Sequence, residues 1–143
     1  MPTTRRSRTV QSAPETVWRV VGDPSHLPRW WPKVQRVESV SGSDFTAVYG
    51  TAKGRPVRAD YRVTASEEPS HRRWEQIVEG SPFERFVSAF ATVADVEPRD
   101  GGTRVTLTVE QKLRGMSRFG GFLAKRGMRK QLDQALDGLE SLL

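Results

Sequence analysis

The stretch MRKQLDQALDGLESLL, residues 128–143, has the clearest periodic pattern in the chain. Its apolar side chains recur every three or four residues, as they do on one face of an α-helix, while its charged side chains fall mostly elsewhere. The apolar stripe consists of Met128, Leu132, Ala135, Leu136, Leu139 and Leu143. This pattern predicts a long amphipathic helix that buries one face at the end of the chain.

The residues just before this helix do not continue the stripe. At about 100° per residue, Phe119, Phe122 and Leu123 point to a different side of a helix from the stripe. We therefore expect the helix to be bent or broken near Gly127, or residues 118–126 to form a separate segment.

Alternating apolar and polar residues between about residues 34 and 113 predict an unbroken series of β-strands. The strands are expected at 34–41, 44–49, 57–66, 72–79, 83–97 and 103–113. In the strand at 83–97, the phase that turns Asp95 and Glu97 outward is preferred, although apolar side chains at 87, 89, 91 and 93 leave the opposite phase open. The side chains placed inward are Phe86, Ser88, Phe90, Thr92, Ala94 and Val96.

A first strand at 4–11 and two short helices precede this series. Pro14 and Glu15 suit the first turn of a helix, because that turn leaves N–H groups without partners and carries partial positive charge. Gly22 ends this helix, and a second short helix runs to about Trp31. Since the helices lie at the two ends of the sequence, the sheet between them has to curl around the last helix to bury its apolar face. The expected fold class is α+β.

The composition is that of a soluble globular protein, and we expect residues 1–143 to form one domain in the cytoplasm. The absence of cysteine excludes disulfides and thiolate metal sites. No stretch approaches the roughly 18–20 apolar residues that a membrane span needs. The basic N-terminus also lacks the apolar run of a signal peptide.

The net charge of +6 raises the question of an anionic partner. We expect no nucleic-acid binding, because the arginines of the strands alternate with acids such as Asp60, Glu75 and Glu79. Only residues 114–130 concentrate positive charge. Within them, residues 118–130 combine large apolar side chains with cations. One interpretation of this segment is transient contact with an anionic membrane. The other is the start of a helix whose cations are solvated.

Several local sequences carry a resemblance to a known family. The matching stretches are SAPETVW at 12–18, GDP at 22–24, LPRWWP at 27–32, EPRDGGTRV at 97–105 and the closing helix. Together with the order of the elements, they resemble the START-like (SRPBCC) superfamily of Bet v 1-like, helix-grip folds, in the branch of polyketide cyclase/dehydrase and lipid-transport proteins. The resemblance implies a seven-stranded antiparallel curved sheet wrapped around the long C-terminal helix, with two short helices after the first strand and a deep cavity beneath the long helix.

The same resemblance implies a hydrophobic small-molecule ligand, since members bind lipids, sterols, polyketides, quinones or hormones. Each aromatic taken alone is more typical of an ordinary core, but for the set we expect a cavity, with Trp30 and Trp31 at its mouth. Gln76 joins the cavity if Trp74 faces inward. The predicted lining residues are Trp30, Trp31, Tyr61, Trp74, Ser88, Phe90, Thr92, Phe119, Phe122 and Met128.

The sequence contains no recognisable catalytic constellation. His26 and His71 have no second histidine at ligand spacing, so we expect no metal and no cofactor. Neither Ser88 nor Thr92 has a base beside it in the sequence. The first hypothesis is a binder or carrier of a lipid-like, polyketide-like or aromatic molecule. The alternative, which rests on the resemblance, is a polyketide cyclase, aromatase or dehydratase acting in the same cavity; the oligomeric state is not indicated.

Overall fold

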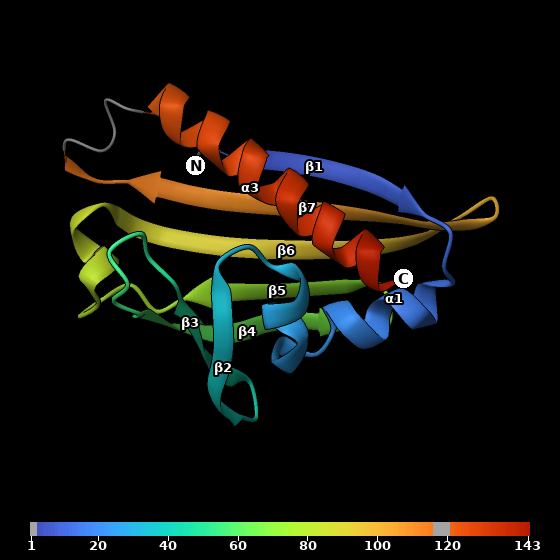
Figure 1. Cartoon of the computed structure of the whole chain (residues 1–143), viewed down its shortest axis with the longest axis horizontal. Coiled ribbons are helices and arrows are strands. Elements are labelled where there is room, and N and C mark those ends of the chain that lie inside the picture. The colour runs from blue at the N-terminus through green and yellow to red at the C-terminus, as the bar shows by residue number, and fades with distance from the viewer. Residues whose placement is uncertain (1–2, 116–120) are drawn as a thin grey trace.

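The computed structural model describes residues 3–115 and 121–143. Within them, seven strands form one antiparallel sheet in the order β1-β7-β6-β5-β4-β3-β2, with helices at the two ends of the sequence (Figure 1). This arrangement confirms the predicted α+β, helix-grip fold. The elements are β1 Thr3–Val10, α1 Pro14–Val21, η1 Pro24–His26, α2 Leu27–Trp30, β2 Val34–Ser41, β3 Asp44–Tyr49, β4 Val57–Glu67, β5 His71–Gln76, η2 Pro82–Arg85, β6 Val87–Arg99, β7 Gly102–Leu113 and α3 Gly121–Leu142.

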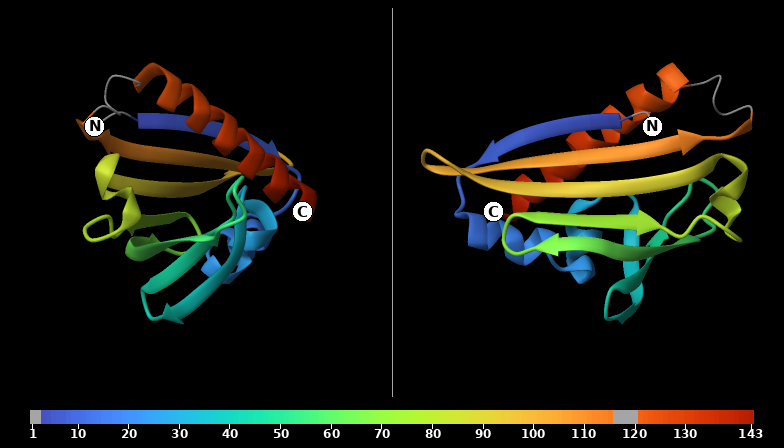
Figure 2. Two further views of the ribbon diagram at one scale, coloured as in Figure 1. Left: turned by 60° about the vertical axis from the view of Figure 1, so that its left-hand side comes forward. Right: turned by 180° about the vertical axis from the view of Figure 1, so that it is seen from behind.

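The short helices after β1 begin where the capping residues predict. α1 starts at Pro14, with Ala13 in the cap position and Glu15 in the first turn. The carboxylate of Asp23 accepts a hydrogen bond from the backbone N–H of Ser25 at 2.9 Å and so caps η1. These helices close one end of the curved sheet (Figure 2).

The core lies between the inner face of the sheet and the C-terminal half of α3. Three alternate side chains of β7 and four side chains of the apolar stripe of α3 are fully buried. They belong to one hydrophobic cluster. They are Val105, Leu107 and Val109 on β7, and Leu132, Ala135, Leu136 and Leu139 on α3. The helix crosses the sheet over β1 and β7 and reaches α2, so its N-terminal half is left above the opposite end of the sheet (Figure 1).

The predicted break near Gly127 is wrong, because α3 runs without interruption from Gly121 to Leu142. Gly127 is exposed, and a Cβ atom there would meet nothing within 4 Å, so the helix continues across it without a packing conflict. Phe122 and Leu123 do point away from the buried stripe, as the 100° geometry predicts, whereas Phe119 lies outside the described residues. No helix in the described ranges is both long and apolar enough to cross a bilayer.

The strand predicted at 83–97 differs from the observed one at its beginning. Residues 82–85 form the helix η2, because the Ser81 hydroxyl accepts a hydrogen bond from the N–H of Phe83 and Pro82 occupies its first turn. β6 then starts with a β-bulge, in which Val87 pairs with Leu113 while Ala89 pairs with the preceding residue Lys112. The bulge shifts the inward phase of the strand by one residue at this point.

Candidate functional site

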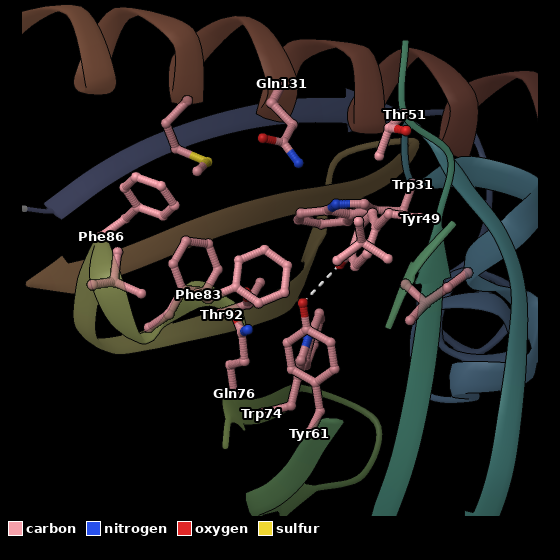
Figure 3. A pocket seen from close by; sticks show the side chains of 15 residues that line it. Trp31, Tyr49, Thr51, Tyr61, Trp74, Gln76, Phe83, Phe86, Thr92 and Gln131 are labelled. Carbon is pink, nitrogen blue, oxygen red and sulfur yellow. Dashed lines mark hydrogen bonds between the residues drawn. The ribbon is translucent and has the colours of Figure 1, made fainter. Parts of the chain in front are cut away.

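A cavity of about 320 Å³ lies under the N-terminal half of α3, where the helix and the sheet separate. Its walls come from α2, β3, β4, β5, η2, β6 and α3, together with the residues at 31, 51 and 86 between elements. Figure 3 shows these side chains converging on one space. A volume of this size is typical of a site for a small molecule, which requires roughly 300 Å³ or more.

The walls of the cavity are mainly apolar, and aromatic rings dominate them. Trp31 and Trp74 meet edge to face with their ring centroids 6.4 Å apart, so that the two indoles fix each other's orientation. Phe45 stacks on Tyr61 from behind, at 5.2 Å between centroids, and thereby supports the tyrosine ring. The apolar and aromatic lining residues are Leu27, Trp31, Tyr49, Val57, Tyr61, Trp74, Phe83, Phe86, Val87, Phe90 and Met128.

The polar lining side chains are all uncharged. They are Thr51, Gln76, Thr92 and Gln131, and the last of these points from α3 into the cavity (Figure 3). Among the described residues that line the cavity, none is an Asp, Glu, Lys, Arg or His. An ionised group placed in this space would lose its hydration without meeting an opposite charge, so the cavity favours a neutral molecule.

Two tyrosine hydroxyls meet inside the cavity. The Oη atoms of Tyr49 and Tyr61 lie 2.7 Å apart, which is a hydrogen bond (Figure 3). Burial raises the pKa of Tyr49, and burial together with the Tyr49 hydroxyl raises the pKa of Tyr61 well above its usual value. Both hydroxyls are therefore protonated at neutral pH. Two O–H groups share one hydrogen bond, so one proton remains available to an acceptor on a ligand.

Gln76 adds a second donor beside this pair. It lies directly opposite Tyr61 in the β4–β5 ladder, so the two side chains emerge on the same face of the sheet. The buried Nε2 atom of Gln76 has no hydrogen-bond partner. A buried donor without a partner carries a desolvation cost of about 1–3 kcal/mol, which a ligand acceptor would relieve. The tyrosine pair and Gln76 thus place uncharged hydrogen-bonding groups side by side on the wall of the cavity.

The structure brings together most of the residues predicted to line the cavity. Trp31, Tyr61, Trp74, Phe90, Thr92 and Met128 all border it. Trp74 does face inward, and Gln76 accordingly borders the cavity as well. These placements come from the period-2 pattern of the strands and the helical stripe of α3.

Other predicted residues lie elsewhere. Trp30 is buried behind Trp31, packed against α3, because the missing side chain of Gly138 lets the helix approach the Trp30 backbone. Ser88 is the extra residue of the β6 bulge. It borders an outer groove together with Arg73 and Glu75, and Val87 lines the cavity instead. Phe122 is 74% exposed. Phe119 falls outside the described part of the chain.

Several lining residues were missed by the sequence analysis. Alternation from Phe45 would have placed Tyr49 inward, and Gln131 lies three residues after Met128 on the same side of the helix. Phe86 was placed inward by alternation but was not named as a lining residue, whereas Phe83 and Val87 depend on η2 and on the bulge, for which the alternating pattern gives no signal. The two histidines are outside the cavity, where the ring of His71 lies 2.6 Å from Asp95. The described residues contain no group of three metal-binding side chains.

Comparisons with known proteins agree with this architecture. The family model described as polyketide cyclase / dehydrase and lipid transport matches residues 1–143. Among solved structures, the chain is similar to TTHA0849 from Thermus thermophilus, with 24% identity and a TM-score of 0.75 over 98% of this chain and 95% of that one. It is also similar to a START superfamily protein from Mycobacterium smegmatis, with 13% identity and a TM-score of 0.79 over 97% and 94% of the two chains.

A third similar structure is the di-domain ARO/CYC BexL from the BE-7585A biosynthetic pathway. The identity is 21% and the TM-score 0.77, over 99% of this chain and 46% of that one, so this chain spans about half of that protein. Identities at this level show that the fold is shared. No curated protein matches the chain.

Proposed function

Because the chain belongs to the polyketide cyclase / dehydrase and lipid transport family, we propose that it binds a neutral, largely aromatic or lipid-like molecule in the cavity under α3. The family and the structural neighbours suggest either hydrophobic ligand binding or polyketide cyclase activity. The ligand carries at least one hydrogen-bond acceptor, such as a carbonyl oxygen, which meets Tyr61 and Gln76.

The observation that carries this proposal is the combination of an aromatic wall with two neighbouring uncharged donors. The rings of Trp31, Trp74 and Phe90 offer flat apolar surfaces, and burial of such surface contributes about 25 cal/mol per Å². The protonated tyrosine pair and the unpartnered Nε2 of Gln76 offer donors and no charge. Apolar walls supply affinity, and the donors orient the molecule.

The same groups favour binding over catalysis. The ionisable side chains that border the cavity are Tyr49 and Tyr61, among the residues the structure describes. Because the pKa of each is raised, neither hydroxyl is ionised at neutral pH, and neither accepts a proton as a general base. Thr51 and Thr92 have no hydrogen bond to a histidine or a carboxylate of the described residues that would activate them as nucleophiles.

Two fluorescent naphthalene probes test the proposal. N-phenyl-1-naphthylamine has no carbonyl group, whereas 6-propionyl-2-dimethylaminonaphthalene has one. We expect both to bind with enhanced fluorescence, and we expect Met128→Trp, which fills part of the cavity, to weaken both. The matched control is Leu123→Trp, because Leu123 is 68% exposed and the added indole lies outside the cavity. Equal effects of the two tryptophan variants would contradict the proposed location.

Gln76→Met tests the donor at the back of the cavity. Loss of one hydrogen bond costs about 0.5–1.5 kcal/mol, so the variant is expected to bind the carbonyl probe roughly 2–13-fold more weakly. Binding of the probe without a carbonyl is expected to stay the same or to improve. Native mass spectrometry of gently purified protein then identifies the class of any molecule that copurifies.

A second candidate function is cyclisation, aromatisation or dehydration of a polyketide in the same cavity. It is supported by the position of Gln76 opposite Tyr61 on the cavity wall, since two donors on one carbonyl oxygen would hold a chain bent and polarise that carbonyl. Incubation with a poly-ketone thioester, followed by mass spectrometry of the released molecule, distinguishes the two functions. Loss of one water per molecule, faster than in buffer and dependent on Gln76, would favour the enzyme.

A further inference from the structure

The positive charges of this protein differ in whether an acid pairs with them. Strand arginines form ion pairs, such as Arg8 with Asp137 at 2.7 Å, Arg62 with Asp44 at 2.9 Å, and Arg73 with Glu110 at 3.0 Å. The cations of the first three turns of α3 form none with any acid among the described residues. These cations are Lys125, Arg126, Arg129 and Lys130, and all four are exposed.

This charge arrangement is unfavourable for an isolated helix. Residues 121–132 contain no acid, and the nearest acid of the helix, Asp133, pairs with Arg6 of β1. Lys125 and Arg129 lie four residues apart, and so do Arg126 and Lys130; like charges at this spacing destabilise a helix by repulsion. Among the described residues, the structure shows no contact through which these four cations stabilise the fold. The unpaired cluster therefore suits a negatively charged partner outside the chain.

Large apolar side chains lie among these cations. Phe122 is 74% exposed and Leu123 is 68% exposed. At about 100° per residue, Phe122, Leu123, Arg126, Arg129 and Lys130 fall within an arc of roughly 120° on the side of α3 away from the buried stripe. We call these five residues the outer face of α3. Exposed apolar and cationic side chains on one helix face are typical of helices that lie on a membrane surface.

The outer face lies on the N-terminal half of α3, and residues of that half also border the cavity. Met128 of the same helix segment borders the cavity together with Phe86, which is itself 57% exposed. Two more exposed cations flank Phe86: Arg85 precedes it, and the backbone N–H of Arg114 donates to its carbonyl oxygen at 2.8 Å. Exposed apolar and cationic side chains therefore occur beside the cavity as well as on α3.

We infer that the outer face of α3 docks on the surface of a bilayer that contains anionic lipid. The cations approach the lipid headgroups, and Phe122 and Leu123 insert at the boundary of the acyl chains. The exposed apolar side chains favour a lipid surface over a nucleic acid, which offers phosphates without an apolar interior. Docking in this orientation brings the helix segment that borders the cavity to the membrane. The inference does not depend on the proposed function, because docking needs no occupied cavity.

Cosedimentation with vesicles tests the inference. We expect the protein to bind vesicles of phosphatidylcholine and phosphatidylglycerol in equal parts, and to bind phosphatidylcholine vesicles much more weakly. Each cation near an anionic surface strengthens binding about fivefold, so Arg126→Gln with Arg129→Gln is expected to weaken it roughly 25-fold. Phe122→Ser with Leu123→Ser is expected to weaken it roughly tenfold or more, since it removes the inserted apolar surface.

Arg19→Gln with Arg104→Gln is the matched control. Both arginines are exposed, and they lie in the last turn of α1 and near the start of β7, at the other end of the molecule (Figure 1). Each double variant replaces two cations and lowers the net charge from +6 to +4. We expect vesicle binding of the control to change less than twofold. An equal loss in both doubles, or no binding to the anionic vesicles, would overturn the inference.

A duplex DNA fragment and the naphthylamine probe distinguish membrane docking from nucleic-acid binding and from binding in the cavity. If Phe122→Ser with Leu123→Ser leaves vesicle binding unchanged and DNA binds as tightly as vesicles, the surface is one for nucleic acid and the inference is wrong. The Arg126 and Arg129 double variant is expected to bind the probe normally, and Met128→Trp is expected to bind vesicles normally. Failure of the cavity proposal and failure of the docking inference therefore give different results.

Discussion

The two halves of α3 share one helix and differ in almost every contact. In the C-terminal half, Leu136 and Leu139 are fully buried, and Gly138 brings the helix against the backbone of Trp30. In the N-terminal half, Met128 borders an open cavity and Phe122 is exposed. The comparison shows that one end of the helix stabilises the fold, whereas the other end leaves surface free for a ligand and a partner.

Charges follow the same division. The acids of α3, namely Asp133, Asp137 and Glu140, all lie in the C-terminal half, and each accepts a hydrogen bond from an arginine of β1. The N-terminal half carries the cations without partners described above. The contacts that stabilise the fold and the surfaces proposed for binding therefore occupy different segments of one element, which allows a substitution in one half to be compared with its counterpart in the other half.

The largest expected difference between the halves comes from truncating one inward-facing side chain in each. Leu136 is 1% exposed, so Leu136→Ala is expected to lower the free energy of unfolding by about 2–5 kcal/mol. Met128 already borders an empty space, so it has fewer partner atoms to lose, and Met128→Ala is expected to cost no more than about 1 kcal/mol. Urea denaturation measures both; equal losses would mean that the cavity is closed in solution.

A smaller difference is expected from the two glycines of the helix. A Cβ atom on Gly138 would lie 2.5 Å from the carbonyl oxygen and 3.0 Å from the Cα of Trp30, so Gly138→Ala is expected to destabilise the protein by about 1–3 kcal/mol. At Gly127 nothing lies within 4 Å, so Gly127→Ala is expected to stabilise it by up to about 1 kcal/mol through helix propensity. A melting temperature that rises in both variants would refute the close contact at Gly138.

The sequence predicted the fold well because the signals for it are local. Alternation placed β3, β4 and β7, Pro14 and Gly22 placed the ends of α1, and the stripe of α3 identified its buried face. The error at Gly127 arose from a sound observation, since Phe122 and Leu123 do leave the stripe. They leave it because that part of the helix passes beyond the core, which no local pattern reports.

The cavity was predicted less completely because its walls depend on departures from regular structure. One extra residue in β6 exchanges Ser88 for Val87 at the lining, and η2 brings in Phe83. Trp30 and Trp31 are adjacent residues of the same type, so the sequence does not distinguish them. The close approach of Gly138 places Trp30 under α3, and Trp31 borders the cavity. The hydrogen bond between Tyr49 and Tyr61 needs the register of β3 against β4, which alternation alone does not fix.

The smallest expected difference concerns the charges of the two halves. Arg8→Gln removes the ion pairs with Asp137 at 2.7 Å and Glu140 at 3.3 Å. Because both acids are largely exposed, the expected loss in the free energy of unfolding is less than about 1 kcal/mol, and it is expected to shrink as salt is added. Urea denaturation at low and high salt measures this dependence.

Arg126→Gln makes the same chemical change in the N-terminal half, and the opposite sign is expected. It removes the repulsion between Arg126 and Lys130 four residues along the helix, which is worth a few tenths of a kcal/mol. The gain arises because no acid among the described residues pairs with Arg126, so the side chain contributes repulsion without compensation. A loss of stability in Arg126→Gln as large as that in Arg8→Gln would show that this cation has a structural partner within the chain. That result would remove the reason for seeking a partner outside it.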